Sequence, residues 1–150
     1  MNNNLIEHES WFKKNWKWFV PLTGTMLILT ISLLIIAFGS VLGNYSKAYA
    51  DPKLYELALE KVKQNERINI TLGEIEPINN MSILNGSVNY SDDNNLVNST
   101  IKITCEKGKA MLDILAERNN KTWDYKLITV RIKSPLEKKE TIEILNLIEE

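Results

Sequence analysis

The chain has 150 residues, a formal net charge of −1, one cysteine and one histidine. This near-neutral charge gives no bulk attraction to nucleic acid, so nucleic acid is not an expected partner. One cysteine excludes an internal disulfide framework. The only histidine, His8, lies in the N-terminal tail, so that a histidine-based metal site or catalytic triad is not expected in the rest of the chain.

Candidate catalytic groups are few. The six glycines are scattered and form no phosphate-binding loop. The carboxylate pairs Glu74/Glu76 and Asp92/Asp93 have no neighbours that indicate a cleft, and we interpret them as surface residues. We therefore expect no catalytic residue, cofactor, metal or small-molecule substrate. An enzyme with a carboxylate-based site is the least favoured alternative.

The first predicted element is an aromatic, lysine-rich segment. On a helical wheel its aromatic rings fall on one side and its lysines on the other. That pattern is typical of a helix lying in the lipid headgroup layer, where tryptophan is favoured. We predict that residues 1–19 form a cytoplasmic tail and this interfacial segment, and that the rings could alternatively contact a partner subunit. The segment consists of Trp11, Phe12, Lys13, Lys14, Trp16, Lys17, Trp18 and Phe19, with Asn15 between them.

A long apolar run follows. From Val20 to Gly43 there is no charged residue. A bilayer core of about 30 Å needs about 20 helical residues, and lipid requires that backbone polar groups pair within the segment. We therefore predict a transmembrane helix at residues 20–43. A buried core helix and a cleaved signal are the alternatives; the run is long for a signal, although Ala48-Tyr49-Ala50 has the spacing of a cleavage site.

The orientation follows from the flanking lysines. Three lysines lie shortly before the run and two, Lys47 and Lys53, lie shortly after it. Lysine-rich flanks stay on the cytoplasmic side. We therefore expect a single-pass protein of the inner or cytoplasmic membrane. Its N-terminus is inside, and residues 44–150 lie outside, in the periplasm or the equivalent intermembrane space.

Residues 44–150 begin with a predicted helix. Asp51 and Pro52 suit its N-cap and first position, and "PKLYELALEKVKQN" repeats apolar residues at helical spacing. The next stretch, "ERINITLG", is compatible with a strand or with a short helical turn that ends at Gly73.

Alternating strand patterns follow in "ILNGSVNY", "LVNSTIKITC", "AMLDILAE" and "WDYKLITVRIK", separated by turn signals in "SDDNN", "EKGK" and "RNNK". Cys105 alternates with Ile101 and Ile103, and we interpret it as a core residue rather than a reactive thiol. The expected faces of the last stretch are Ile128, Val130 and Ile132 on one side and Trp123, Tyr125 and Leu127 on the other. The tail "TIEILNLIEE" fits an edge strand or a short helix.

The predicted fold class is α+β. One N-terminal transmembrane helix is followed by a small domain in which one long helix packs on a three- to four-stranded antiparallel sheet. The helix must cover the apolar face, because a lone sheet would leave that face in water.

These elements together resemble the cytochrome oxidase complex assembly protein family, which also includes a Tim-type accessory subunit of the mitochondrial inner-membrane translocase. The matching pieces cover most of residues 11–133. They are "NWKWFVP" with the apolar run, "YELALEKVKQNERINITLGEIEPI", "NGSVNY", "STIKITCEKGKAMLDILAE" and "WDYKLITVRI". The family usually has more glycine and proline around the Lys-Gly-Lys turn, whereas here Cys105-Glu106 precedes it.

The resemblance implies a function without catalysis. It implies a membrane-anchored assembly factor for cytochrome c oxidase or a related respiratory complex, whose partners are membrane lipid and a subunit of that complex. The candidate partner-binding surfaces are the membrane-near helix and the hairpin formed by Lys107, Gly108 and Lys109, unless that hairpin is only a tight turn. The alternative function is a membrane-anchored sensor or regulatory binding domain facing the envelope.

Overall fold

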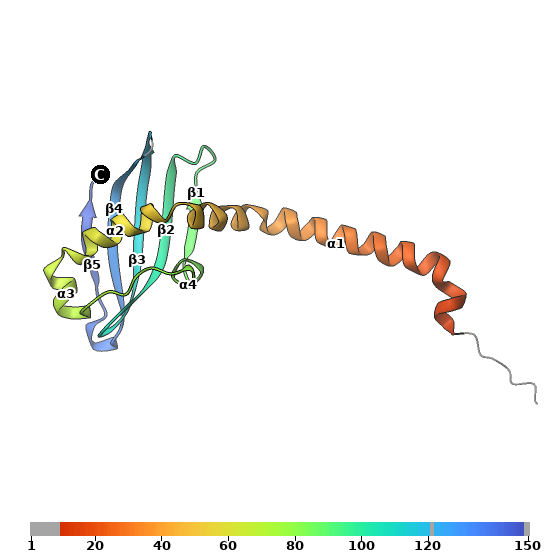
Figure 1. Cartoon of the computed structure of the whole chain (residues 1–150), viewed down its shortest axis with the longest axis horizontal. Helices are drawn as coiled ribbons and strands as arrows, with labels where there is room; N and C mark the ends of the chain where they lie inside the picture. Colours follow the sequence, from red (N-terminus) through yellow and green to blue (C-terminus); the bar gives the residue numbers. More distant parts are fainter. Residues whose placement is uncertain (1–9, 121, 149–150) are drawn as a thin grey trace, which may run out of the picture. The chain divides into compact units, whose positions relative to one another are not determined.

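The computed structural model describes residues 10–120 and 122–148, so the beginning of the predicted cytoplasmic tail, including His8, lies outside the described residues. The chain consists of two compact units, residues 1–40 and residues 41–150. The described part of the first unit lies within one long helix, and the second unit contains the sheet and the remaining helices (Figure 1).

Helix α1 (Trp11–Ala50) is 40 residues long and is apolar and long enough to cross a membrane. The aromatic, lysine-rich segment is therefore the start of this helix rather than a separate element. Figure 1 shows that α1 bends near its N-terminal end, and Pro21 lies inside this helix. A proline inside a helix favours such a bend, because it has no N–H to donate and its ring crowds the preceding turn. Hydroxyls in the apolar run donate to carbonyls one turn back, as Thr30 does to Met26 at 2.8 Å.

The sheet is an antiparallel meander in the order β1-β2-β3-β4-β5. Its strands are β1 (Ser87–Tyr90), β2 (Leu96–Cys105), β3 (Gly108–Asn119), β4 (Thr122–Ser134) and β5 (Thr141–Asn146). The α+β class is confirmed. Five strands form instead of the expected three to four, because the tail adds β5 at the edge beside β4.

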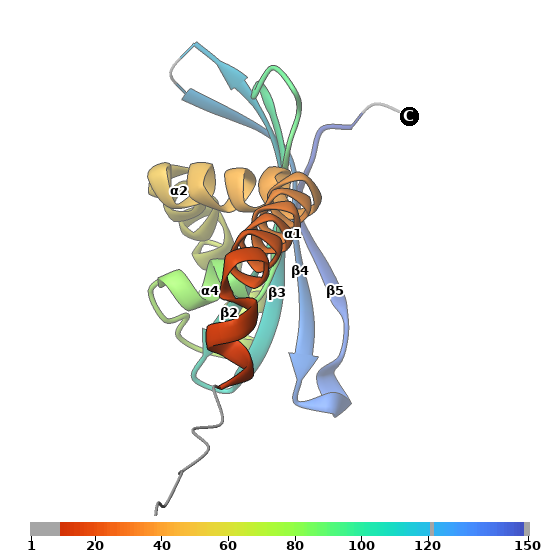
Figure 2. The same ribbon diagram turned by 90° about the vertical axis from the view of Figure 1, so that its right-hand side faces the viewer.

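Three helices lie on one face of this sheet (Figure 2). They are α2 (Pro52–Lys63), α3 (Glu66–Leu72) and α4 (Asn80–Leu84), and a short 3₁₀ turn, η1 (Leu136–Lys138), precedes β5. Helix α2 is the predicted long helix. The ambiguous stretch after it is helical, and it ends at Gly73, whose φ of 71° suits a residue without Cβ.

Helix α4 was not expected from the sequence, which predicted a strand in "ILNGSVNY". Only Ser87–Tyr90 of that stretch is a strand. Asn79 caps α4 by accepting from the Ser82 N–H at 3.0 Å, and the Ser82 hydroxyl accepts from the Asn79 N–H at 3.3 Å. This capping box pairs backbone N–H groups at the start of a helix of five residues. The chain therefore turns before it enters β1.

The faces expected for β4 are right for Ile128, Val130 and Ile132 and for Leu127, but they are wrong for Trp123 and Tyr125. Trp123 and Tyr125 are buried on the same side as Ile128. The cause is a bulge: Leu115 pairs with Leu127 and Ala116 pairs with Tyr125, so Lys126 has no partner on β3. One extra residue reverses the alternation, and aromatic and aliphatic side chains of β4 therefore reach one core.

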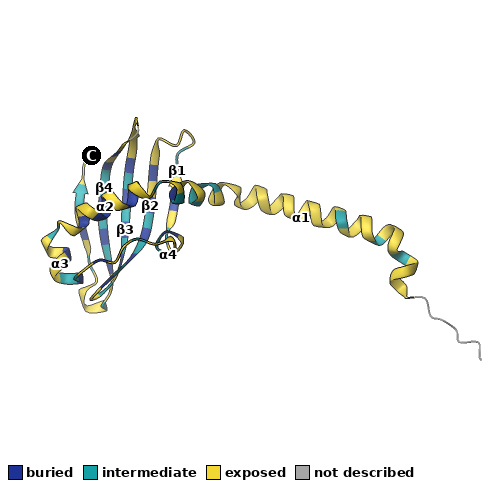
Figure 3. Ribbon diagram, viewed as in Figure 1, coloured by how far each residue is buried: buried dark blue, intermediate teal, exposed yellow. Residues whose placement is uncertain are grey.

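The core lies between the helices and the sheet (Figure 3). Alternate residues of β2 and β3 enter it, as the sequence predicts. Cys105 is part of this core, and burial raises the pKa of its thiol to about 11, so the thiol stays protonated at neutral pH. The end of α1 also contributes, because Ala48 is fully buried. Cleavage after Ala50 would remove this core residue.

Candidate functional site: a groove beside helix α2

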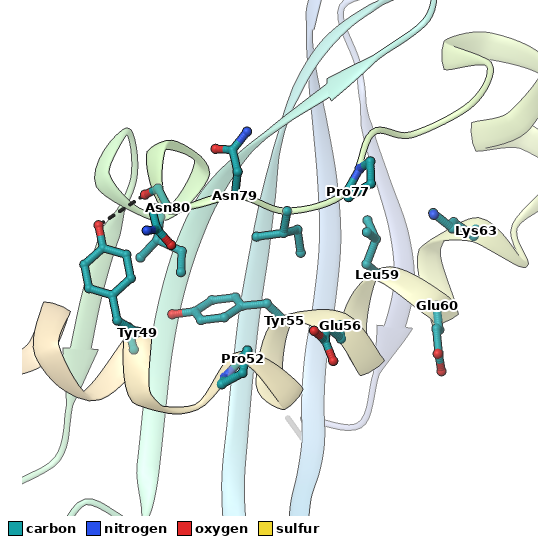
Figure 4. A pocket seen from close by; sticks show the side chains of 13 residues that line it. Tyr49, Pro52, Tyr55, Glu56, Leu59, Glu60, Lys63, Pro77, Asn79 and Asn80 are labelled. Atoms are coloured by element: carbon teal, nitrogen blue, oxygen red, sulfur yellow. Dashed lines mark hydrogen bonds between the residues drawn. The ribbon is translucent and has the colours of Figure 1, made fainter.

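A groove of about 290 Å³ lies between α2 and the segment that leads into α4 (Figure 4). The end of α1 closes it on one side, where the Tyr49 hydroxyl donates to the Asn80 carbonyl at 3.1 Å. Three separate stretches of residues 48–83 therefore build one concave surface. The lining residues are Ala48, Tyr49, Pro52, Tyr55, Glu56, Leu59, Glu60, Lys63, Pro77, Ile78, Asn79, Asn80 and Ile83.

The floor of the groove is apolar and fixed. Tyr55, Leu59 and Ile83 are buried in the domain core beneath it. The Tyr55 hydroxyl shares a hydrogen bond of 3.2 Å with the hydroxyl of Ser99 on β2. Burial raises the pKa of Tyr55 above its ordinary value, and the ring therefore stays neutral. A preformed apolar floor suits an apolar occupant.

The rim of the groove is charged on one side. Glu56 and Glu60 stand one helical turn apart on α2, and both are exposed. Figure 4 shows Pro77 and Asn79 across the opening from α2, and it shows the Glu60 side chain directed away from them. Among the described residues neither glutamate forms an ion pair. Lys63, three residues after Glu60 on α2, is also exposed and lines the groove, so the rim carries two carboxylates and one ammonium group, a net charge of −1.

A second depression of about 640 Å³ lies on the other flank of α2. It is larger, but half of its lining is charged or amide side chains that water already solvates, including Lys61, Gln64 and Lys126. The groove beside Pro77 has an apolar floor, and we take it as the candidate site.

The predicted interfacial residues all lie in the first turns of α1. Their rings form edge-to-face pairs, with centroids 5.4 Å apart for Trp11 and Phe19 and 5.7 Å apart for Phe12 and Trp16. Trp11 remains 59% exposed, and Lys13, Lys14 and Lys17 are exposed as well. The structure thus brings the rings together along one helix. That they contact lipid headgroups stays a prediction.

The predicted hairpin is tied to the rest of the domain. Its turn consists of Glu106 and Lys107, and Gly108 is the first residue of β3, paired with Cys105. The Glu106 N–H donates to the Glu74 carbonyl and the Lys107 N–H to the Leu72 carbonyl, both at 2.9 Å. The side chains of Glu106, Lys107 and Lys109 are exposed. The hairpin therefore holds the end of α3, and a partner-binding role for it stays an untested expectation.

Sequence reasoning missed a polar junction at Asp51. This residue stands between α1 and α2, but its carboxylate does not cap α2. Instead it accepts from the Trp123 indole N–H at 2.8 Å and from the Arg118 guanidinium at 2.9 Å. The helix junction is thereby fixed to the hairpin of β3 and β4. No local sequence signal links residues so far apart.

A second polar cluster lies on the sheet face away from the helices, where Asp113 pairs with Arg131. Asp113 also accepts from the Thr100 hydroxyl at 2.6 Å. Burial opposes ionisation of Asp113, but its hydrogen bonds to Arg131 and Thr100 outweigh burial and lower its pKa below the usual value. The charged form is thus favoured in the folded state.

Asp113→Asn should therefore change the pH dependence of stability. A depressed folded pKa stabilises the fold above the unfolded pKa of about 3.9, and this contribution is lost as pH falls through the folded pKa. We expect the variant to lose about 1 to 2 kcal/mol at pH 7 and to show a flatter decline in acid. Urea unfolding of the full chain in detergent, followed by circular dichroism over a pH series, measures both. Asp92→Asn, in an exposed turn, is the control; parallel pH curves for Asp113→Asn and the unsubstituted chain would contradict the assignment.

These features define a class: a small α+β domain that follows a helix long and apolar enough to cross a membrane and that carries an apolar groove with an acidic rim. Within residues 10–120 and 122–148, no three His, Cys, Asp or Glu side chains come together as a metal site.

A family model described as cytochrome oxidase complex assembly protein 1 matches residues 25–146. The match spans most of the chain, and the chain belongs to this family. The resemblance inferred from the sequence is therefore confirmed. No curated protein and no solved structure matches the chain significantly.

The bounds of this match show which candidate sites lie within the family's shared region. It begins inside α1 and ends with β5, so it includes the groove and the Lys107–Lys109 hairpin. It does not reach the aromatic, lysine-rich segment, although that segment contributed to the resemblance. The relation to the Tim-type subunit stays an expectation.

Proposed function

We propose that this chain is a membrane-anchored, non-enzymatic assembly factor for cytochrome c oxidase or a related respiratory complex, and that it holds a subunit while the complex forms. The observation that carries the proposal is the family match over residues 25–146. The groove supports it, because an apolar surface with an acidic rim can bind another chain without reacting with it.

The anchor in this proposal is α1, with residues 20–43 in the bilayer and the rings of the first turns at the lipid surface. The lysine excess before the span supports a cytoplasmic N-terminus and a domain on the outer side. Protease added to spheroplasts should then remove the domain, whereas protection of the domain would contradict this orientation.

The groove also bears on the alternative of a ligand sensor. Pockets that enclose a small molecule typically have about 300–1,000 Å³. The groove, at about 290 Å³, falls at the lower limit of that range. It therefore suits one or two side chains of a protein better than a whole ligand, whereas the depression of about 640 Å³ on the other flank of α2 has the volume for a small molecule but is lined half by charged and amide side chains.

Deletion of the gene tests the function. We expect reduced haem–copper oxidase activity and reduced assembled oxidase, with oxidase transcripts unchanged, because an assembly factor acts after synthesis. The full chain should restore activity, and residues 1–50 alone should not. Unchanged oxidase together with altered transcription of other genes would support the sensor instead.

A further inference from the structure

The groove begins where α1 leaves the predicted membrane span. Gly43 ends the uncharged run, and Tyr49 lines the groove six residues later in the same helix. At a rise of 1.5 Å per residue, Tyr49 is at most about 9 Å beyond Gly43, and any tilt of the helix shortens that distance from the membrane. Headgroup layers are roughly 5–8 Å thick. The Tyr49 end of the groove therefore lies close to the membrane surface, where residues that flank a partner's span also lie.

The lining limits the chemistry of the occupant. Leu59, Ile78 and Ile83 offer only apolar surface, and Tyr55 has its hydroxyl directed to Ser99. The volume admits an anchoring side chain, the kind of contact that dominates many protein interfaces. A polar occupant would lose hydrogen bonds to water without replacement. The occupant is therefore an apolar side chain.

The rim adds a charge requirement. Glu56, Glu60 and Lys63 give the rim a net charge of −1, and neither glutamate forms an ion pair among the described residues, so a lysine or arginine next to the anchoring side chain would complement the glutamates. Segments that flank a span on the outer side carry few lysines and arginines. An acidic rim facing them would thus discriminate among membrane subunits.

We propose that the groove binds an apolar side chain flanked by lysine or arginine in the juxtamembrane segment of a membrane-embedded subunit. This inference rests on the proposed function for the identity of that subunit. The rule of recognition, an apolar side chain flanked by lysine or arginine, depends only on the groove, its rim and the distance between the groove and the span.

Photo-cross-linking in cells tests the proposal. Lys63→benzoylphenylalanine places the probe on the groove, and Lys61→benzoylphenylalanine places it two residues away on the same helix, outside the groove. We expect the Lys63 variant alone to cross-link a peptide within about ten residues of a span that contains an apolar residue beside lysine or arginine. A peptide remote from any span, a lipid adduct, or equal products from both positions would overturn the proposal.

Charge reversal provides the second arm. Glu56→Lys combined with Glu60→Lys should lower the yield from the Lys63 probe about three- to tenfold, because a like charge then faces the partner. Asp92→Lys combined with Glu137→Lys changes the net charge equally, away from the groove, and should leave the yield unchanged. Equal yields in the two double variants would overturn the role of the rim.

The two proposals fail separately. If deletion lowers oxidase but the Lys63 probe gives no product specific to the groove, the docking proposal falls and the assembly function stands. If the probe captures a basic juxtamembrane segment of a protein outside the respiratory chain and deletion leaves oxidase intact, the assembly function falls and the rule of recognition stands.

Discussion

Gly108→Ala is expected to prevent stable folding of the domain. A Cβ at this position would lie 1.9 Å from the Ser134 carbonyl oxygen and 2.8 Å from the carbonyl carbon. Both atoms belong to the backbone of β4, so no side-chain rotation can relieve the contact, and β3 and β4 would have to separate at their ends. We expect a loss of at least about 3 kcal/mol, a large part of the stability of a small domain. Protease resistance of the full chain in detergent, together with its abundance in the membrane, measures the loss.

The two lysines of the hairpin are the matched control. Lys107→Ser combined with Lys109→Ser leaves the strand backbone unchanged, and we expect stability to stay within about 0.5 kcal/mol. This comparison separates packing from binding at the hairpin. Normal stability of Gly108→Ala would contradict the close approach of the strands. Loss of oxidase in a stable lysine double variant would support the hairpin as a partner surface.

Several elements could be predicted because their signals are local. In β2 and β3 the core residues alternate without interruption, so counting by two finds the buried face. The start of α2 follows from Pro52 and from apolar residues at helical spacing. The length of the uncharged run in α1 likewise needs no knowledge of the rest of the fold.

The sequence-based predictions that the structure corrects are those in which a contact between residues distant in sequence overrides the local pattern. In β4, pairing with β3 leaves Lys126 unpaired and turns Ile128 to the side of Tyr125, and nothing in "WDYKLITVRIK" marks that register shift. The five residues of α4 are too few to show helical periodicity. Strand β5 forms because β4 offers an edge, while its own sequence suits a strand or a helix.

The groove could not be predicted for a related reason. Its residues come from the end of α1, from α2 and from the segment before α4, and they meet only when all three pack on the sheet. Glu56 and Glu60 are ordinary exposed helix residues in the sequence. They become part of a rim because Pro77 and Asn79 lie across the opening from α2.

The junction at Asp51 provides the last prediction, because it links this groove to the sheet. Asp51→Ala removes both acceptor contacts, to Trp123 and to Arg118, and leaves the buried indole N–H without its partner. Charge-assisted hydrogen bonds of this kind contribute about 1 to 3 kcal/mol, and the partial exposure of Arg118 places the expected loss in the lower half of that range. Asp51→Asn keeps an acceptor and should lose less.

Hydrogen exchange of the full chain in detergent would measure this effect. Protection should fall in peptides that cover α2 and residues 123–125, and it should stay unchanged in Asp92→Ala, where an exposed turn carboxylate is removed. Combining Asp51→Ala with Trp123→Phe should cost less than the sum of the two changes, since they remove the same contact. Additive losses would show that the two residues act independently. Because Pro52 and Tyr49 on either side of Asp51 line the groove, a loosened junction should also lower the yield of the Lys63 cross-link, even though Asp51 itself does not line the groove.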